Sequence, residues 1–533
     1  MKATKSWLVA AITLGACAVR LWGIAFGLPY PEARPDETAV VGAALGMLQT
    51  GPNPHFFVYP TFFLYVLSAL FWMSSIVGRF TGWYASPAFT LGEPSAAAHW
   101  LLFARVVVAV IGTATVPLLY NLVGRLFSTQ SALIAATLLA VSFLHVRDSH
   151  FGVTDVPMAF MIVLALWVVV AHPLDWSHRA NVFRAAVVCG LAASTKYNAI
   201  IVIAPLVVAT VQQQWASRHW PALLISPLLI GLGAGVGFVV GTPYAIFDYA
   251  AVRNALAATS LLLEGHAGLR VGYGWIRHFT VSLWYGVGWP MLLAALAGVV
   301  LTLVTNVKRA VVLLAFPISY YTAMGAGQAV FVRYMDPVVP FVCALAAFAI
   351  WWLAVRIERA FPSLRAVATA VLLACAAAGL SAARVIAFDR LATRVDTRVA
   401  AANWLEQSFP AGATFYQLGG TYARLELPAT FRSWTYDPSV DLIKAPSSAL
   451  PSVVIVFTSP LRLYTPSISD LAKEVLRARY RSGKLFEGES SHEDRRSVYD
   501  EQDAFFLPLS GFEVIRAPGP TIEVFEFVSR SEF

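Results

Sequence analysis

Acidic, basic and aromatic residues that could bind a ligand gather at the ends of apolar stretches in this 533-residue chain. An ionised side chain at membrane depth costs about 2.5–3.5 kcal/mol on insertion scales, so residues that persist near such segments are candidates for function. The candidates are Asp36 and Glu37; His55 and Tyr59; Asp148, His150 and Asp155; Lys196; Glu264 and His266; and Arg333 and Tyr334. A bound anion would explain the cations among them.

Each group also has a plain structural explanation. Asp36 precedes an expected surface helix, so it could be an N-cap, and Glu37 could be a first-turn acid that suits the helix dipole. The aromatic residues around Tyr59 could form an interfacial belt, and Asp155 could cap the helix that follows it. Isolated cations such as Lys196 could snorkel to the interface or pair with an acid. A zinc site near Asp155 lacks a recognised ligand spacing, so no metal ligand is assigned.

The composition places most of the chain in a membrane. Hydrophobic residues make up 58% and charged residues 13%, and the mean hydropathy is +0.66, values that exclude a soluble enzyme. Residues 1–384 hold 22 Lys and Arg but 11 Asp and Glu, whereas residues 385–533 hold 16 and 19. The net charge of +8 therefore arises in the apolar part, which favours membrane orientation over nucleic-acid binding as its explanation. We predict a transmembrane domain over 1–384 and a soluble domain over 385–533.

Twelve apolar segments recur along the first part, and each is a candidate membrane span. They cover 7–28, 58–78, 101–123, 130–146, 155–171, 185–200, 200–214, 221–241, 280–304, 310–325, 337–355 and 366–384. If 58–78 lies in the interface without crossing, one face collects most loop cations and the other collects nine of the eleven acids. The cation-rich face is cytoplasmic by the positive-inside rule. The sequence thus predicts eleven crossings, an uncleaved first span, a cytoplasmic N-terminus and an extracytoplasmic tail.

The tail has the alternating pattern of an α/β domain. Helical periodicity covers 397–408 and 469–480, and strand-like runs cover 452–457 and 521–528. Its sequence contains neither a glycine-rich phosphate loop nor the spacing of zinc ligands. The four cysteines of the chain stand in apolar segments and are interpreted as buried thiols, so redox chemistry is not indicated.

The order of the polar motifs resembles that of the phospholipid-carrier-dependent glycosyltransferases, which have the GT-C fold. The shared motifs are Pro35-Asp36-Glu37 in the first outer loop, Tyr59-Pro60, Thr154-Asp155 at the start of a span, Thr195-Lys196 at the end of one, and Arg333-Tyr334 followed by two prolines. This group includes the protein O-mannosyltransferases and the transferase that adds aminoarabinose to lipid A. The resemblance covers about residues 1–384.

The resemblance implies a GT-C-like fold with juxtamembrane helices in the first outer loop. Combined with the loop charges and the pattern of the tail, it predicts a polytopic α-helical protein with about eleven transmembrane helices and a C-terminal soluble α/β domain. It implies an integral-membrane glycosyltransferase in the cytoplasmic membrane. Such an enzyme would move a sugar from a polyprenyl-phosphate carrier to a hydroxyl of an acceptor lipid, glycan or protein on the outer face. Membrane lipid is then a partner and nucleic acid is not. The competing interpretation is a multi-pass transporter or flippase of lipids or lipid-linked sugars.

The resemblance implies a catalytic Asp in the first outer loop, which Asp36 matches, and from the chemistry of the transfer we predict roles for the other candidate residues. Asp36 would be the general base, and Glu37 would orient Asp36 or the acceptor. The donor phosphate and sugar would be bound by Lys196, Arg333, Tyr59, His55, Asp155 and Tyr334. A second set of candidates consists of Asp148, His150, Glu264 and His266. No cofactor is assigned, and a divalent metal stays open.

Overall fold

The computed structural model describes residues 2–82, 88–261, 269, 271–434, 450–490 and 497–528. They form two compact units. The first, called the membrane unit, comprises residues 1–24 and 36–386, and the second, called the tail unit, comprises residues 25–35 and 387–533. The eleven residues 25–35 lie near the N-terminus of the sequence, but they fold with the tail unit.

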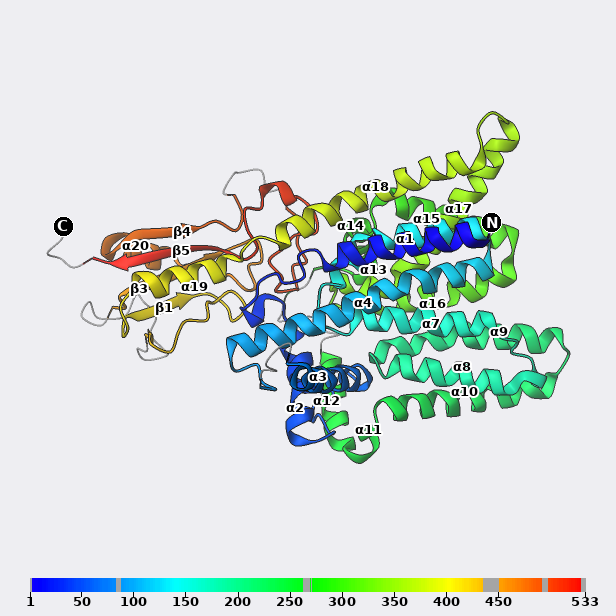
Figure 1. Ribbon diagram of the computed structural model, residues 1–533, viewed down its shortest axis with the longest axis horizontal. Coiled ribbons are helices and arrows are strands. Elements are labelled where there is room, and N and C mark those ends of the chain that lie inside the picture. The colour runs from blue at the N-terminus through cyan, green and yellow to red at the C-terminus, as the bar shows by residue number, and fades with distance from the viewer. Residues whose placement is uncertain are drawn as a thin grey trace. The chain divides into compact units, whose positions relative to one another are not determined.

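The membrane unit is built from helices, the last of which continues into the first residues of the tail unit, 387–392 (Figure 1). They are α1 (Lys2–Leu21), α2 (Glu37–Thr50), α3 (Phe62–Thr81), α4 (Pro94–Leu126), α5 (Thr129–Ala140), α6 (Phe143–Asp148), α7 (Asp155–Ala171), α8 (Arg179–Ala193), α9 (Ile203–Ala216), α10 (Trp220–Gly241), α11 (Tyr244–Phe247), α12 (Tyr249–Leu261), α13 (Gly274–Arg277), α14 (Trp284–Gly286), α15 (Trp289–Thr305), α16 (Val307–Gly325), α17 (Val339–Ala360) and α18 (Ala366–Ala392). Short 3-10 turns cover Trp176–His178 (η2), Tyr197–Val202 (η3) and Val332–Val338 (η6), and a π-helical turn covers His278–Leu283 (η5).

Six helical segments of the described residues are long and apolar enough to cross a membrane, or seven if the bent pair Gly274–Gly286 and Trp289–Thr305 is one span. Shorter apolar helices cover Ser6–Leu21, Thr129–Ala140 and Asp155–Ala171. The chain is therefore a multi-pass membrane protein. The predicted number of eleven crossings is not confirmed by this count, because several predicted segments form helices shorter than a full span.

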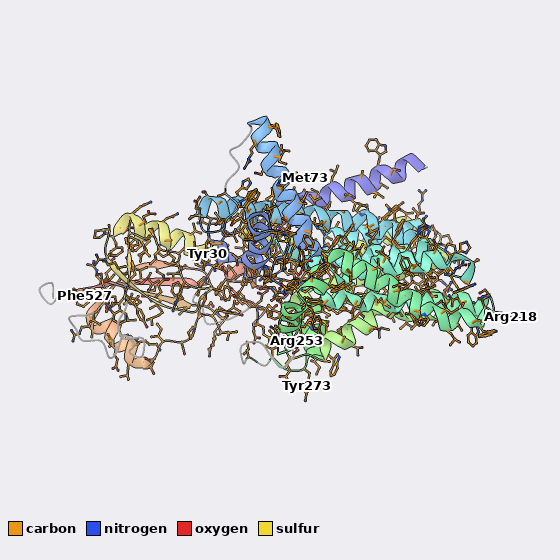
Figure 2. All side chains as sticks on the ribbon, turned by 90° about the horizontal axis from the view of Figure 1, so that it is seen from below. Tyr30, Met73, Arg218, Arg253, Tyr273 and Phe527 are labelled. Carbon is orange, nitrogen blue, oxygen red and sulfur yellow. The ribbon has the colours of Figure 1, made fainter. Side chains whose placement is uncertain are left out.

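The predicted interfacial segment 58–78 becomes α3, which is itself apolar enough to cross a membrane. Its direction differs from that of the other long helices. In Figure 1, α3 is seen end-on, whereas α4, α7, α8 and α10 lie along the picture. Figure 2 shows Met73 of α3 to one side of the helical unit, and Arg218, from the turn between α9 and α10, at one end of it. Thus α3 runs across the bundle rather than along it.

Helices α8 and α10 pack closely because small residues line their contact. A Cβ on Gly190 of α8 would lie 2.0 Å from the carbonyl oxygen of Ala234, and a Cβ on Gly237 of α10 would lie 2.0 Å from that of Val187. Only glycine allows the two backbones to approach this closely. This close packing holds α8 against α10. Helix α8 ends at Ala193, directly before the break that contains Lys196.

The tail unit contains a mixed five-stranded sheet in the order β2-β1-β3-β5-β4. The strands are β1 (Thr414–Leu418), β2 (Arg432–Ser433), β3 (Val453–Thr458), β4 (Tyr480–Phe486) and β5 (Thr521–Phe527), and the helices are α19 (Thr397–Ser408) and α20 (Asp470–Arg479), with 3-10 turns η1 (Pro31–Ala33) and η8 (Phe512–Val514). Strand β3 pairs in parallel with β1 and antiparallel with β5. Leu476 of α20 packs with Val454 and Val456 of β3. The predicted C-terminal α/β domain is present.

Candidate functional site

The membrane unit contains a cavity of about 320 Å³. It is lined by Asp36, Val58, Tyr59, Lys196, Tyr197, Asn198, Thr259, Ala323, Met324, Gly327, Ala329, Phe331, Arg333 and Tyr334. Five of the predicted site residues, Asp36, Tyr59, Lys196, Arg333 and Tyr334, are among them. The long loops and the ends of α2, α8, α12 and α16 thus converge on one hollow, which is large enough for a sugar and a phosphate group.

Asp36 and Arg333 meet directly. The Arg333 Nη2 lies 2.7 Å from the Asp36 Oδ2, and the Arg333 guanidinium stacks 4.6 Å from the centre of the Phe331 ring. Arg333 is 9% exposed at its side chain, whereas Asp36 is 33% exposed. The arginine is therefore held in the wall of the cavity, while the carboxylate is accessible from it.

The backbone of Asp36 is unusual for a residue with a side chain. Its φ is +71° and it stands at the N-cap position of α2, but its side chain makes no capping hydrogen bond. A left-handed residue other than glycine costs on the order of 1–3 kcal/mol and persists only where the surroundings determine it, often at functional sites. The capping explanation of Asp36 is therefore wrong for its carboxylate, which turns to Arg333 instead.

Lys196 pairs with Asp155 and is enclosed by aromatic rings. Its Nζ lies 2.6 Å from the Asp155 Oδ1, 5.7 Å from the centre of the Tyr59 ring and 5.5 Å from that of Tyr334. Ring faces attract a cation, so both tyrosines and the carboxylate hold the ammonium group in place. Asp155 does not line the cavity, and its contact with Lys196 makes it a positioning residue.

The position of Lys196 depends on a break between two helices. The sequence predicts this break around residues 196–198, and α8 indeed ends at Ala193 before η3 begins at Tyr197. The Ser194 carbonyl accepts a hydrogen bond from the Phe62 amide, and the Ser194 hydroxyl contacts the Thr242 hydroxyl at 2.7 Å. The beginning of α3 and the end of α10 therefore hold the break that presents Lys196.

Tyr59 precedes α3 and contributes a phenol to the cavity. Burial raises its pKa well above the ordinary value of 10, and the neighbouring Asp36 carboxylate raises this pKa further. Both effects disfavour the phenolate. Tyr59 therefore keeps its proton at neutral pH and can donate a hydrogen bond to an anion in the cavity.

Glu37 follows Asp36 in the chain but does not line the cavity. It is fully buried, and its carboxylate accepts from Nε of Arg105 at 2.9 Å, from Nη2 at 2.6 Å and from the Gly152 amide at 2.6 Å. Removing one partner of such a buried pair costs about 3–5 kcal/mol. Of the two roles predicted for Glu37, contact with an acceptor is corrected by this geometry, because Glu37 joins α2 to α4 and to the loop that leads to α7. That Glu37 orients Asp36 stays a prediction.

His55, like Asp155 and Glu37, lies outside the cavity lining. Its side chain is 72% exposed, and its Nδ1 lies 3.2 Å from Asp248 Oδ2 and 3.2 Å from Asn53 Nδ2. The prediction that His55 holds the donor phosphate is therefore corrected, because an exposed histidine paired with a carboxylate is not directed at the anion-binding side chains.

Asp148 and His150 are buried but serve the packing of α6. The Arg147 Nη1 contacts Asp148 Oδ1 at 2.7 Å, and the His150 ring nitrogens contact the carbonyl oxygens of Val146 and Trp22, both at 2.9 Å. Burial lowers the pKa of His150 to about 4, so the ring is neutral at physiological pH. Neither residue lines the cavity. Glu264 and His266 lie outside the described residues.

Two polar residues near the site were not selected from the sequence. Asn198 lines the cavity and its Nδ2 donates to the Tyr320 hydroxyl at 2.9 Å. Asp336 is fully buried on η6, and neither carboxylate oxygen has a hydrogen-bond partner among the described residues. The sequence signal was the proximity of Asn198 to Lys196 and of Asp336 to Arg333. Within the described part of the chain, His, Cys, Asp and Glu form no group of three or more suited to a metal ion.

Comparison with known proteins agrees with this architecture. Residues 55–254 match the family model described as dolichyl-phosphate-mannose-protein mannosyltransferase. This segment includes Tyr59, Asp155 and Lys196, whereas Asp36 and Arg333 lie outside it. A search of the curated proteins finds no match.

Two solved structures resemble the whole chain. ArnT from Cupriavidus metallidurans, bound to undecaprenyl phosphate, has a TM-score of 0.53 at 13% identity, with 97% of this chain and 97% of that chain covered. The apo oligosaccharyltransferase from Archaeoglobus fulgidus has a TM-score of 0.52 at 12% identity, with coverage of 98% and 88%. At these identities the likeness is one of fold. The chain thus shares the fold of these two structures, as the resemblance noted in its polar motifs predicts, and residues 55–254 match the mannosyltransferase family model.

Proposed function

We propose that the protein is an integral-membrane glycosyltransferase that moves a sugar from a polyprenyl-phosphate carrier to an acceptor hydroxyl. The observation that carries the proposal is the cavity in which Asp36 meets Arg333 while Lys196 stands between two tyrosine rings. It combines an accessible carboxylate with two cations and a phenol. The family match over 55–254 supports sugar transfer over transport.

Asp36 acts as the general base in this proposal. Its carboxylate takes the proton of the acceptor hydroxyl as the hydroxyl oxygen attacks the anomeric carbon of the donor sugar. The bond between that carbon and the phosphate oxygen breaks, and the polyprenyl phosphate leaves with the bonding electrons. A single attack of this kind inverts the configuration at the anomeric carbon. Proton transfer by a positioned group contributes typically about 10²–10⁴-fold to the rate.

Lys196, Arg333 and Tyr59 stabilise the departing phosphate. Each presents a donor at the wall of the cavity, and Lys196 and Arg333 are each already oriented by a carboxylate. Binding of the donor phosphate to Arg333 competes with its contact to Asp36. The anionic donor therefore draws the arginine away and leaves the Asp36 carboxylate to accept a proton, so donor binding and activation of the base are coupled.

The location also suits a lipid-linked donor. Nucleotide sugars are not supplied outside the cytoplasmic membrane, so a sugar on a lipid carrier is the activated donor there. The acceptor is a lipid, glycan or protein that presents a hydroxyl at the outer face. In this proposal, side chains of the protein carry out both steps: Asp36 accepts the proton, and Lys196 and Arg333 stabilise the phosphate.

The proposed function is tested with purified full-length protein and tritium-labelled sugars on undecaprenyl phosphate, including mannose, galactose and arabinose. We expect at least one labelled donor to lose its sugar to an acceptor or to water, with undecaprenyl phosphate as the second product. The same protein in vesicles loaded with the labelled donor provides the control. Movement of intact donor between leaflets without cleavage would support the transporter and contradict the transferase.

We further propose eleven crossings with a cytoplasmic N-terminus and an extracytoplasmic tail. The crossing helices are α1, α4, α5, α7, α8, α9, α10, α15, α16, α17 and α18, while α3 lies in the outer interface. The direction of α3 across the bundle (Figure 1) and the position of Arg218 at one end of it, away from Arg253 and Tyr273 (Figure 2), support this topology.

Cysteine labelling in intact cells checks the topology, in a background whose four native cysteines are replaced by alanine. Asp470→Cys in the tail unit, where the side chain is 94% exposed, should react with a membrane-impermeant maleimide before lysis. His178→Cys, at a site 49% exposed, should react only after lysis. Reaction of His178→Cys in intact cells, or protection of Asp470→Cys, would contradict the orientation.

A further inference from the structure

The tail unit contains a cavity of its own, with a volume of about 440 Å³. It lies at the carboxyl end of β3, where Thr458 pairs with Thr521 at the start of β5. Its lining residues all belong to the tail unit and are Thr458, Ser459, Pro460, Arg462, Thr465, Pro466, Ser467, Glu489, Ser490 and Thr521. The volume is in the range of small-molecule sites, and the proposed sugar transfer uses none of these residues.

Hydroxyl groups dominate the lining of this cavity. Six of the ten described lining residues are serine or threonine, and two are proline. Arg462 and Glu489 add one positive and one negative charge. Each hydroxyl can both donate and accept a hydrogen bond, whereas a guanidinium only donates and a carboxylate only accepts. The lining therefore matches a neutral ligand that carries many donors and acceptors close together.

The loop that follows β3 gives one wall of the cavity a fixed shape. The Thr465 hydroxyl lies 2.8 Å from the Ser459 hydroxyl, and Thr465 is 4% exposed. The Tyr464 hydroxyl donates to the Gln502 carbonyl oxygen at 2.7 Å, and the Tyr464 carbonyl oxygen accepts from the Gly420 amide at 2.9 Å. The loop is thus attached to two other segments of the tail unit. A wall that is ordered before binding lowers the entropy cost of holding a ligand.

Glu489 is held in another wall of the cavity. Its carboxylate accepts a hydrogen bond from the Ser497 hydroxyl, and the Tyr499 hydroxyl lies 3.5 Å from its second oxygen. The Thr521 hydroxyl oxygen accepts from the Glu489 amide at 3.3 Å. These contacts orient the carboxylate. They also leave it with acceptor capacity, because an ionised carboxylate has about four lone-pair sites.

Four other lining side chains are available to a ligand. Within the described part of the chain, the side chains of Thr458, Arg462, Ser467 and Ser490 take part in no hydrogen bond or ion pair. Arg462 can donate to hydroxyl oxygens of a ligand, while Glu489 can accept hydroxyl protons. Hydrogen bonds to such charged groups are stronger than those between neutral groups. The cavity therefore offers both halves of the bonding that a row of hydroxyl groups needs.

We infer that this cavity of the tail unit binds a neutral saccharide. Neighbouring hydroxyls of a sugar ring present donors and acceptors side by side, as the lining does. An inorganic anion would use Arg462 and the hydroxyls but would be repelled by Glu489, and a metal cation would be repelled by Arg462. The saccharide site goes beyond the proposed sugar transfer, because its residues take no part in that chemistry.

The inference is tested by saturation-transfer NMR with full-length protein in lipid nanodiscs, which avoid detergents with sugar head groups. The probes are maltose, lactose, mannobiose and chitobiose, each without a lipid-linked donor. We expect saturation transfer to at least one disaccharide. Arg462→Ala should weaken its binding by about 10-fold or more, because hydrogen bonds to a charged group are lost. The Arg462 side chain is exposed, so this variant should fold.

The matched control is Arg481→Ala, which removes another exposed arginine of the tail unit outside the cavity and should bind the disaccharide as the wild type does. Excess undecaprenyl phosphate, added to fill the cavity of the membrane unit, should not displace the disaccharide. The inference is overturned if no disaccharide binds, or if Arg462→Ala binds as tightly as the wild type. Arg462-dependent binding of inorganic phosphate without binding of any disaccharide would also overturn it and would identify an anion site.

Discussion

Asp36→Asn is expected to reduce sugar transfer by about 10²–10⁴-fold, because it removes the proton acceptor and leaves the shape of the side chain almost unchanged. Asparagine tolerates the left-handed region nearly as well as aspartate, so the φ of +71° can be kept. The loss should appear in kcat, since Lys196 remains available to bind the donor phosphate. Single-turnover consumption of a labelled undecaprenyl-phosphate sugar measures it.

Asp248→Asn is the control for this experiment. Asp248 is another carboxylate in a loop of the membrane unit, and it contacts Asn53 and His55 outside the cavity. It should retain the wild-type rate at matched expression. Near wild-type turnover in Asp36→Asn would remove Asp36 from the chemistry, and a comparable loss in Asp248→Asn would show that the effect is not specific to the cavity.

Arg333→Ala should have the next largest effect. It removes a cation from the place where charge develops on the leaving phosphate, and loss of one such donor costs about 2.7–4 kcal/mol, or about 10²–10³-fold in kcat. The kcat of Arg333→Lys should lie between those of the wild type and Arg333→Ala, because lysine keeps the charge but not the planar fork that can contact carboxylate and phosphate together. Titration with undecaprenyl phosphate should also show weaker binding in both variants.

The matched control is Arg253→Ala on α12. Arg253 is exposed and does not line the cavity, so its loss removes a surface charge without touching the site. Unchanged donor binding in Arg333→Ala, with the protein folded, would show that the phosphate is held elsewhere. If Arg253→Ala were as defective as Arg333→Ala, the effect would be one of general surface charge.

The coupling between Arg333 and Asp36 separates these two predictions. Arg333→Ala leaves the Asp36 carboxylate without its cationic partner, whereas Asp36→Asn leaves Arg333 available for the phosphate. We therefore expect donor affinity to be lost in the first variant and retained in the second. A shared loss of affinity in both would indicate that the 2.7 Å pair acts as one unit in binding.

Local features of the fold could be predicted because they depend on neighbouring residues. The tail helix over 397–408 and the strand over 452–457 correspond to α19 and β3, since periodicity and β-branched runs report local burial. The break at Lys196 was likewise visible as polar residues inside an apolar run. The number of spans was harder to predict, because hydropathy does not distinguish a helix such as α3 that runs across a bundle from one that runs along it.

The amino-acid sequence by itself determined the membrane character and the positions of most helices, and it identified five of the residues that line the cavity. Only the tertiary structure decided which charges meet. Glu37 pairs with Arg105, 68 positions away, rather than with Asp36 or a substrate. His55 pairs with Asp248, and Arg34 pairs with Asp503. Sequence spacing does not reveal these partners, because the stability of an ion pair depends on which side chains lose water together when distant elements pack.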